Sequence, residues 1–532
     1  MRYLAFILTI VLSLLCLILG KVVSPHFCWA LLALVPLALL GCWDLVQTKH
    51  SITRNYPIIA HLRFLFESIR PEIRQYFIES NIDGRPFNND ARSLIYERAK
   101  NIDGLKPFGT ELDVYGEEYE WLNHSMAPRP KSEELFRTTV GGPDCKHPYS
   151  CSIFNISAMS FGALSPNALL SLNAGAKKGD FYHCTGEGGV SPYHLKNGGD
   201  LVWQIGTGYF GCRNNDGTFN PDLFQEQASH EAVKMIEIKI SQGAKPGHGG
   251  VLPASKVTSE IASTRKILMG EDCISPPGHT TYDSPIGLCN FIAQLRELSG
   301  GKPVGFKLCI GHPSEFLSVC KAMLKTGILP DFITVDGGEG GTGAAPLEFS
   351  DNMGMPLKTG LIFVHNALVG CNLRDKIKVA AAGKVSSAFT LARCLSIGAD
   401  WCNAARGFMM AVGCIQAQEC HTNKCPVGVA TQDPRRQQAL NVPDKSERTF
   451  NFHHNTMVAL TEVIAAAGLD HPDQLRPWHI YLRSKRTEVL SYHEAFDFLE
   501  PGDLLGDDCP YPVYKKFWNR ASSETFQTDK SD

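Results

Sequence analysis

Three closely spaced cysteines are the residues of this chain whose types and spacing most directly suggest chemistry. The stretch Cys414–Thr431 reads CIQAQECHTNKCPVGVAT, with five residues between Cys414 and Cys420 and four between Cys420 and Cys425. Thiolates are the protein ligands of iron–sulfur clusters, and the Pro and Gly after the last cysteine allow a tight turn. Three ligands suit a three-iron cluster. A zinc site with His421 as fourth ligand and a set of buried free thiols are the alternatives.

Four other segments set polar residues among glycines. They are Ala158–Ser165, Thr185–Gly189, Gln242–Gly247 and Asp336–Gly343. Glycine lets a backbone approach a ligand closely, and successive N–H groups in such turns can hold a phosphate. One such loop is ordinary turn chemistry, but several of them together predict a binding rim.

Short apolar runs precede these loops and recur between helical stretches. We expect eight strands, at Ser152–Ile156, Phe181–Cys184, Val202–Ile205, Met235–Ile240, Val304–Cys309, Phe332–Val335, Ile377–Ala381 and Trp401–Ala404. Wholly apolar runs between helices are typical of parallel strands buried on both faces. Eight repeats predict an α/β fold of the (β/α)8 TIM-barrel type, in which all the loops above meet on one rim. An open doubly wound sheet is the alternative, although no Gly-x-Gly-x-x-Gly opens the first unit.

Composition narrows the class of protein. The 532 residues carry a net charge of −3, and 44% of them are hydrophobic, so nothing indicates a nucleic-acid partner. The 18 cysteines are scattered, mostly one at a time within apolar runs. This pattern favours reduced thiols in a cytoplasmic body over a disulfide scaffold.

The N-terminus predicts a membrane anchor. Tyr3–Gly20 is uncharged and Phe27–Val46 carries only Asp44, and each run approaches the ~20 residues that span a bilayer. A signal peptide is the alternative for the first run alone. Basic residues lie before and after the pair, which places both ends in the cytoplasm. We therefore expect an inner-membrane protein whose body faces the cytoplasm.

These features divide the chain into four segments. We expect a transmembrane helical hairpin at 1–48, a helical collar at 49–145, the barrel with the cysteine loop at 146–440, and a C-terminal helical extension and tail at 441–532. In the collar, Pro71 is expected to break a helix or to start a new one. The extension has helical character around Asn455–Ala467 and His493–Leu499.

The motifs together resemble the FMN-binding synthase domain of glutamate synthase, over about residues 150–435. The matching segments include those above, Glu237–Gly247, Ile274–Pro277 and Cys414–Gln432. The hairpin and collar are similar to a free-standing, membrane-anchored bacterial branch of that family. The resemblance does not extend to the family's glutaminase domain or to its C-terminal glycine-repeat domain. It implies a barrel that holds FMN beside a [3Fe–4S] cluster bound by Cys414, Cys420 and Cys425.

The resemblance also implies a set of cofactor residues. These are Ala158, Met159, Ser160, Lys307, Gly338, Gly383, Lys384, Arg406 and Gly407. Lys307 would lie by the pyrimidine edge of the flavin, where an ammonium stabilises the charge of the reduced ring. The chain departs from the family at the phosphate loops, where Ala382-Gly383-Lys384 replaces Asp-Gly-Gly and Ala405-Arg406-Gly407 replaces a Gly-Thr turn.

For the substrate, the resemblance implies Lys245, Arg265 and Ser284 as binding residues, with Lys245 also in a catalytic role. Cations and hydroxyl donors suit a dicarboxylate. Glu187 matches a glutamate that assists imine formation or proton transfer. Two neighbouring positions depart from the family: His248 replaces an acid, and Val251 replaces a glutamine that contacts the substrate.

The implied activity is that of a glutamate synthase-like oxidoreductase acting on CH–NH2 donors, in the direction of glutamate biosynthesis. It would aminate 2-oxoglutarate or a similar 2-oxo acid reductively, with ammonia or an amine as the nitrogen source. The alternatives are an N-methylglutamate synthase-like subunit and a membrane-docked electron-transfer subunit. Because no nucleotide-binding fingerprint is present, electrons are expected from a separate reductase or from ferredoxin.

Overall fold

The computed structural model describes residues 2–102 and 104–527, and the chain divides into two compact units, Met1–Asp90 and Ala91–Asp532. The end of the expected tail, 528–532, lies outside the described residues.

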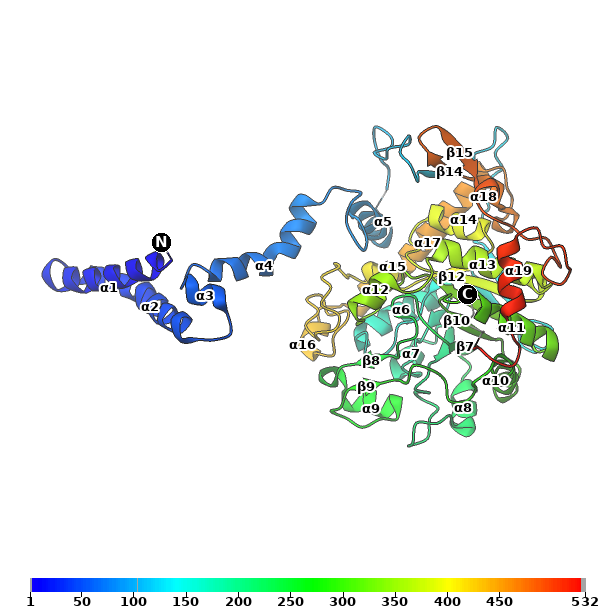
Figure 1. Cartoon of the computed structure of the whole chain (residues 1–532), viewed down its shortest axis with the longest axis horizontal. Helices are drawn as coiled ribbons and strands as arrows, with labels where there is room; N and C mark the ends of the chain where they lie inside the picture. Colours follow the sequence, from blue (N-terminus) through cyan, green and yellow to red (C-terminus); the bar gives the residue numbers. More distant parts are fainter. Residues whose placement is uncertain (1, 103, 528–532) are drawn as a thin grey trace. The chain divides into compact units, whose positions relative to one another are not determined.

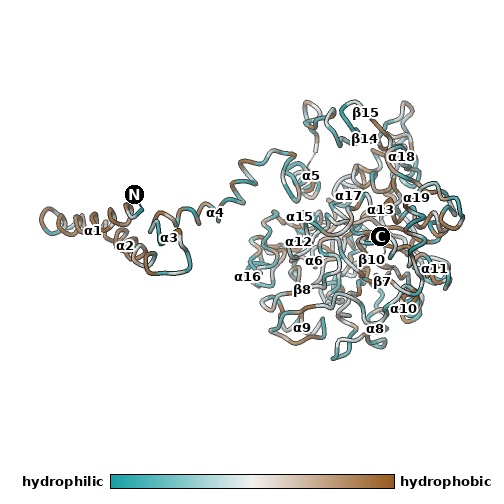
Figure 2. The backbone as a smooth tube through the Cα atoms, in the orientation of Figure 1, coloured by the Kyte–Doolittle hydropathy of each residue, from teal (hydrophilic) through white to brown (hydrophobic). Residues whose placement is uncertain are grey.

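Two apolar helices begin the N-terminal unit. α1 (Leu4–Val22) and α2 (Leu31–Val46) are joined by the 3-10 helix η1 (Pro25–Ala30), and Figure 2 shows both as predominantly hydrophobic. Leu4–Val22 and Pro25–Val46 have the length and composition of membrane spans, with mean hydropathies of 2.6 and 2.0. A Cβ at Gly41 would lie 2.2 Å from the ring of Phe6, so the two helices pack closely.

Three short helical elements follow in the same unit. They are α3 (Ser51–Asn55), α4 (His61–Ile73) and the π-helix η2 (Arg74–Ile78). The break or helix start predicted at Pro71 is wrong, because α4 continues through this residue and the irregularity comes after it, in η2. Proline removes one helical hydrogen bond, and on this exposed helix water can satisfy the carbonyl that loses its partner.

A closed parallel barrel forms the centre of the C-terminal unit (Figure 1). Its strands are β4 (Phe154–Ile156), β5 (His183–Cys184), β6 (Leu201–Ile205), β7 (Val233–Lys239), β10 (Val304–Leu308), β11 (Phe332–Asp336), β12 (Lys378–Ala382) and β13 (Trp401–Ala404). All eight predicted strands are present, in sequence order around the ring. The pairing of Cys402 with Phe154 and of Ala404 with Ile156 closes it. The predicted TIM barrel is confirmed.

Helices surround the strands. They are α6 (Pro166–Gly179), α7 (Pro192–Leu195), α8 (Pro221–Ala228), α10 (Pro285–Leu298), α11 (Pro313–Thr326), α13 (Leu357–Gly370), α14 (Ala388–Ser396), α15 (Arg406–Ala411) and α17 (Val442–Ala466). Several start in the same way, with a polar N-cap followed by proline: Ser165 accepts from the Ala168 N–H, and Asn220 accepts from the Leu223 N–H. This sequence signature fixes where each helix leaves the rim.

Smaller elements cover the barrel. Antiparallel sheets join β1 (Glu120–Leu122) to β14 (Ile480–Lys485) and β15 (Glu488–Ser491), β2 (Arg137–Val140) to β3 (Tyr149–Ser152), and β8 (Val251–Leu252) to β9 (Cys273–Ile274). Short helices include α5 (Asn89–Lys100), α9 (Ser259–Arg265), α12 (Leu347–Asn352), α16 (Pro434–Gln437), α18 (Tyr492–Ala495) and α19 (Pro512–Arg520). The helix predicted around Asn455–Ala467 is part of α17. The one predicted around His493–Leu499 is limited to α18, which follows the β14–β15 hairpin.

The barrel interior has an apolar layer and a polar layer. The apolar cluster contains Cys184, Val202, Met235, Phe332 and Trp401. The polar layer, in which Glu237 accepts hydrogen bonds from Gln204 and Thr334, lies nearer the carboxyl ends of the strands and leads into the rim loops. The core therefore seals one end of the barrel and leaves the other end for chemistry.

Candidate functional site

The loops after β4 and β5 pack directly on each other. Gly186 has a φ of +66°, and a Cβ there would lie 2.7 Å from the Ser160 nitrogen and 2.9 Å from the Met159 carbonyl carbon. The Met159 N–H also donates to the Cys184 carbonyl at 3.5 Å. Only glycine fits this contact, so the predicted flavin loop Ala158–Ser160 is positioned by the loop that carries Glu187.

Glu187 is the carboxylate of a buried charge cluster. Its Oε1 lies 2.8 Å from Lys239 Nζ, and the two side chains are 17% and 9% exposed. Burial opposes ionisation of Glu187, but the positive charges of Lys239, Arg265 and Lys245 hold its pKa below the ordinary value. At neutral pH the site therefore contains a carboxylate surrounded by three cationic side chains.

Lys245 belongs to this cluster through its charge. It is buried, with 3% of its surface exposed. Burial lowers its pKa, Glu187 opposes that effect, and Lys239 reinforces it. Among the described residues no carboxylate lies within ion-pair distance of the Lys245 ammonium, because Glu187 pairs with Lys239 instead.

Arg265, at the end of α9, is held against the loop after β4. Its Nη2 donates to the Phe161 carbonyl at 3.0 Å and to Ser160 Oγ at 3.4 Å, and its guanidinium lies over the ring of Phe210 at 5.1 Å. Its buried Nε has no hydrogen-bond partner among the described residues. Ser284 takes no part in these contacts. It is the N-cap of α10, where its Oγ accepts from the Gly287 N–H.

Lys307 projects from β10 into the polar layer of the barrel. It is paired in register with Lys239 on β7, so the two side chains leave the sheet on the same face. Burial lowers the pKa of Lys307, but Asp336 and Glu237 outweigh it and raise the pKa above the ordinary value. The ammonium is therefore fully charged at the floor of the site.

The predicted phosphate residues lie after β12 and β13, against the glycine loop after β11. Arg406 Nη2 donates to the Glu339 carbonyl at 2.5 Å, and a Cβ at Gly383 would lie 3.6 Å from the Glu339 carboxyl carbon. Lys384 has a φ of +51°, in the left-handed region. Burial lowers the pKa of Arg406, against the effects of Asp336 and Glu339. Gly383 and Arg406 therefore lie against the loop that contains Gly338, and Lys384 and Gly407 adjoin them in sequence.

The loop after β11 needs glycine where it meets the loop after β7. A Cβ at Gly243 would lie 1.7 Å from the Gly337 carbonyl oxygen, and the Gly243 N–H donates to Asp336 Oδ2 at 2.8 Å. The Gly338 N–H donates to the Met355 carbonyl at 2.8 Å. The glycine-bearing loops are therefore in mutual contact, as their common position on a barrel rim predicts.

The three cysteines of the predicted cluster site share one loop but do not converge on a point. In the described part of the chain, no group of three or more His, Cys, Asp or Glu side chains is placed to hold a metal ion. Their sulfurs are near enough to interact: burial raises the pKa of Cys414 to about 12, and the charges of Cys420 and Cys425 add to this. All three are free thiols.

The cysteine loop is fastened to the loop after β4. Gln432 Nε2 donates to the carbonyls of Gly162 and Leu164 at 3.1 and 2.8 Å. The Ser165 N–H donates to the Val429 carbonyl at 2.9 Å. The two loops are thus neighbours across the β13–β4 seam, although more than two hundred residues separate them in sequence.

Three residues of the site were not singled out from sequence. Lys239 pairs with Glu187, and Glu237 accepts from Gln204 and Thr334, both at 2.6 Å. His279 Nε2 lies 2.9 Å from the Lys239 carbonyl, and burial lowers its pKa to about 4. The signal was present in Glu237-Ile-Lys239, because two polar residues spaced by two in a buried strand face the barrel interior.

Comparisons with known proteins agree with the motifs. The family model described as a conserved region in glutamate synthase matches residues 144–470. A glutamate synthase large subunit-like protein, YerD, of Bacillus subtilis (strain 168) is 34% identical over 524 residues, which cover 91% of this chain and 98% of the relative.

Two other relatives match over a smaller part of their length. The archaeal-type glutamate synthase (NADPH) of Thermotoga neapolitana is 33% identical over 60% of both chains, and the archaeal glutamate synthase (NADPH) of Methanocaldococcus jannaschii is 33% identical over 64% of both. The chain thus spans about three fifths of these two relatives. The resemblance carried by the rim loops is confirmed at the level of the family, and the chain belongs to the glutamate synthase family.

Proposed function

We propose that this chain is a free-standing, membrane-anchored oxidoreductase that uses FMN and a [3Fe–4S] cluster to aminate 2-oxoglutarate, or a similar 2-oxo acid, reductively. The observation that carries the proposal is the Glu187 carboxylate held among Lys239, Lys245 and Arg265. A dicarboxylate needs cations, and amination needs a group that moves protons. Both are present on the rim of a barrel of the glutamate synthase family.

The residues present fit FMN. Gly186, Gly243 and Gly338 keep the rim free of side chains where the loops meet, and Lys307 is a buried cation in the polar layer beneath them. We assign the isoalloxazine to the loop Ala158–Ser160 with Lys307 at its pyrimidine edge. The phosphate is assigned to Gly383, Lys384, Arg406 and Gly407. When bound, FMN would supply hydride transfer to the imine carbon.

The chain's own residues would bind and orient the substrate. Lys245 would take one carboxylate, because its ammonium lacks an ion-pair partner among the described residues. Arg265 would take the other through its unpartnered Nε. Its Nη2 already donates to Ser160 and Phe161 beside the flavin and its Nη1 donates to Cys273 Sγ, so substrate and flavin loop would share one rigid side chain. Ser284 would donate a hydrogen bond from the start of α10.

Glu187 would hold and move the proton. Its pKa lies below the ordinary value, so the free site starts with Glu187 as a base. A dicarboxylate that pairs with Lys245 and Arg265 would withdraw part of their positive charge from Glu187. That change raises its affinity for a proton when the imine forms.

The cysteine loop fits the proposed cluster in its donor set. Its three thiols interact electrostatically with one another. Lys256 lies beside them, and its Nζ donates to the Cys420 carbonyl at 3.0 Å. Cys414, Cys420 and Cys425 would hold the cluster, which would supply electron transfer. Convergence of the sulfurs would accompany binding, as is usual for metal sites.

Membrane anchoring rests on α1 and α2. Both meet the length and apolarity of a membrane span, and they form a tightly packed pair. Positive residues at both ends of the pair would place the barrel on the cytoplasmic side of the inner membrane. A reductase or ferredoxin would deliver electrons there.

Two measurements on the purified chain test this function. The absorbance spectrum before and after acid release should contain FMN bands and the broad shoulder of an iron–sulfur cluster. The chemically reduced protein should be reoxidised by 2-oxoglutarate plus ammonium and should form glutamate. A colourless, folded preparation would refute the cofactors, and a coloured preparation that forms no amino acid would refute the reaction.

A second candidate function follows from His248 and Val251, the two positions beside the proposed substrate site that depart from the family. We call them the substrate wall. His248 packs edge-on against Phe349, with ring centroids 5.3 Å apart, and its Nδ1 lies 2.8 Å from the Gly249 carbonyl. Val251 provides no amide donor. This less polar wall would favour an N-alkylated amine, as in an N-methylglutamate synthase-like subunit. Replacing ammonium by methylamine in the reoxidation assay separates the two functions.

A further inference from the structure

The helix that follows the apolar hairpin carries an apolar stripe along one side. Its members recur at positions i, i+3, i+4, i+7 and i+11, which fall on one face of a helix. They are Leu62, Leu65, Phe66, Ile69 and Ile73, with exposures of 49%, 52%, 61%, 38% and 38%. Tyr76, Phe77 and Ile78 extend the exposed apolar surface into η2. In a water-facing helix such a stripe calls for a covering partner.

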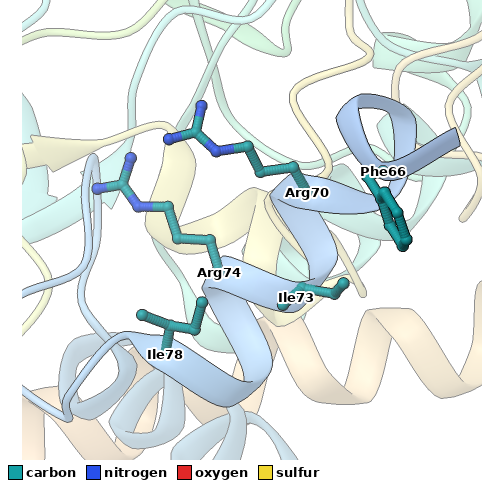
Figure 3. A pocket seen from close by; sticks show the side chains of 5 residues that line it. All are labelled: Phe66, Arg70, Ile73, Arg74 and Ile78. Carbon is teal, nitrogen blue, oxygen red and sulfur yellow. The ribbon is translucent and has the colours of Figure 1, made fainter. Parts of the chain in front are cut away.

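Basic side chains lie beside the stripe. Phe66, Arg70, Ile73, Arg74 and Ile78 line a groove of about 430 Å³, and Figure 3 shows the two arginines extending from the same side of the helix. Arg74 Nε lies 3.1 Å from Glu79 Oε1. For Arg70, no carboxylate of the described residues lies within ion-pair distance. The groove thus combines an apolar wall with a guanidinium available to an anion.

The start of α4 is fastened to the end of α2. Asp44, in the last turn of α2, is buried and accepts from the Ile58 N–H at 2.9 Å. His61, the first residue of α4, places its Nε2 2.8 Å from Asp44 Oδ1. If α2 ends at the membrane boundary, α4 therefore begins there too.

We propose that α4 and η2 form a lipid-binding helix, which lays its apolar stripe on the cytoplasmic leaflet and binds anionic phospholipid headgroups through Arg70 and Arg74. The apolar groove takes acyl-chain surface, and the guanidiniums take the phosphate. Charge favours this occupant over a second copy of the chain, because both charged residues of the groove are arginines and an identical groove would present the same positive charge. The inference rests on the membrane anchoring proposed above.

The test is hydrogen–deuterium exchange of the full chain in nanodiscs. One set contains phosphatidylcholine alone, and the other also contains phosphatidylglycerol. A third sample has phosphatidylcholine nanodiscs with added inorganic phosphate. Amides of residues 61–78 should exchange more slowly only with the anionic lipid. Arg70→Gln should weaken this protection by about fivefold, the effect of one basic side chain at an anionic surface.

Arg63→Gln is the matched control, because Arg63 loses the same charge from the same helix but pairs with Glu67 and does not line the groove. It should keep the protection, and unchanged exchange in the barrel strands should show that both variants fold. Equal protection in both lipids would show that the helix does not select anionic headgroups, and protection that persists in detergent would assign the stripe to a protein neighbour; either result would overturn the proposal. Protection by inorganic phosphate in phosphatidylcholine nanodiscs would overturn the lipid assignment. A chain that fails to enter nanodiscs at all would instead refute the anchor.

Discussion

Replacement of Glu187 by glutamine removes the negative charge from the cluster at the barrel rim and leaves its shape nearly unchanged. The Glu187 carboxylate and the Lys239 ammonium are 2.8 Å apart, so their direct attraction is about 6 kcal/mol at an effective dielectric constant of 20. This value does not yet include the cost of desolvating the two ions. Desolvation of both ions offsets part of it, and breaking a buried pair typically costs about 3–5 kcal/mol. Both side chains are less than a fifth exposed, so we expect a loss of about 3 kcal/mol in the free energy of unfolding.

The same change should separate substrate binding from turnover. Once Glu187 is neutral, no carboxylate offsets the positive charges of Lys239, Lys245 and Arg265. These three side chains then attract a bound anion more strongly, so the dissociation constant for 2-oxoglutarate should fall. Turnover should fall by about 100-fold or more, because the group that moves the proton is gone. Stopped-flow reoxidation of the reduced protein gives both quantities from one series of substrate concentrations.

Glu120→Gln is the control for stability. Glu120 lies on β1 and forms ion pairs at 2.7 Å with Lys358 and at 2.8 Å with Arg393, and its side chain is 12% exposed. It should lower the melting temperature to a similar extent and leave reoxidation unchanged. If Glu187→Gln keeps normal turnover, or weakens the binding of 2-oxoglutarate, the reasoning about the cluster is refuted.

Three further predictions concern the neighbouring loops. Gly186→Ala places a methyl group 2.7 Å from the Ser160 nitrogen, so the flavin content per chain should drop sharply, and retention of full flavin content would contradict the close packing of the two loops. Cys414→Ser should lower iron and acid-labile sulfide while flavin content is retained, and unchanged metal analysis would rule out the cluster site. His279 has a folded pKa of about 4 against 6.5, so the unfolded chain takes up its proton first. Stability should therefore be lost as pH falls through this window, by about 2 kcal/mol at pH 5, and melting curves of His279→Gln should show a shallower slope there.

The barrel was predictable because its strands are buried on both faces. Runs such as Val304–Leu308 and Phe332–Asp336 consist mostly of apolar residues that favour a buried strand. Glycine or a polar N-cap marks each end of such a run. The β14–β15 hairpin was missed for the opposite reason. Its residues are half exposed, and β14 pairs with β1, some 360 residues earlier in the chain, a contact that no local pattern encodes.

The site was predictable as a set of loops but not as a set of contacts. The spacing of Glu187 and Lys245 shows that both follow strands, and a barrel then brings them to one rim. That Lys239 is the ion partner of Glu187 depends on the tilt and register of β7, which sequence does not state. The cysteines show the same limit, since their spacing permits a cluster but does not fix where three sulfurs meet.

The hydrogen bonds of Gln432 tie the cysteine loop to the first-strand loop, and this has a consequence for how small molecules enter. Because these bonds hold the two loops together, the cysteine loop cannot move away from the first-strand loop. That side of the barrel opening therefore stays closed. The excursion between β7 and β10 belongs to the same closed side, because Lys256 Nζ donates to the carbonyls of Ala163 and Cys420. Small molecules should therefore enter past the remaining loops of the rim rather than through this side.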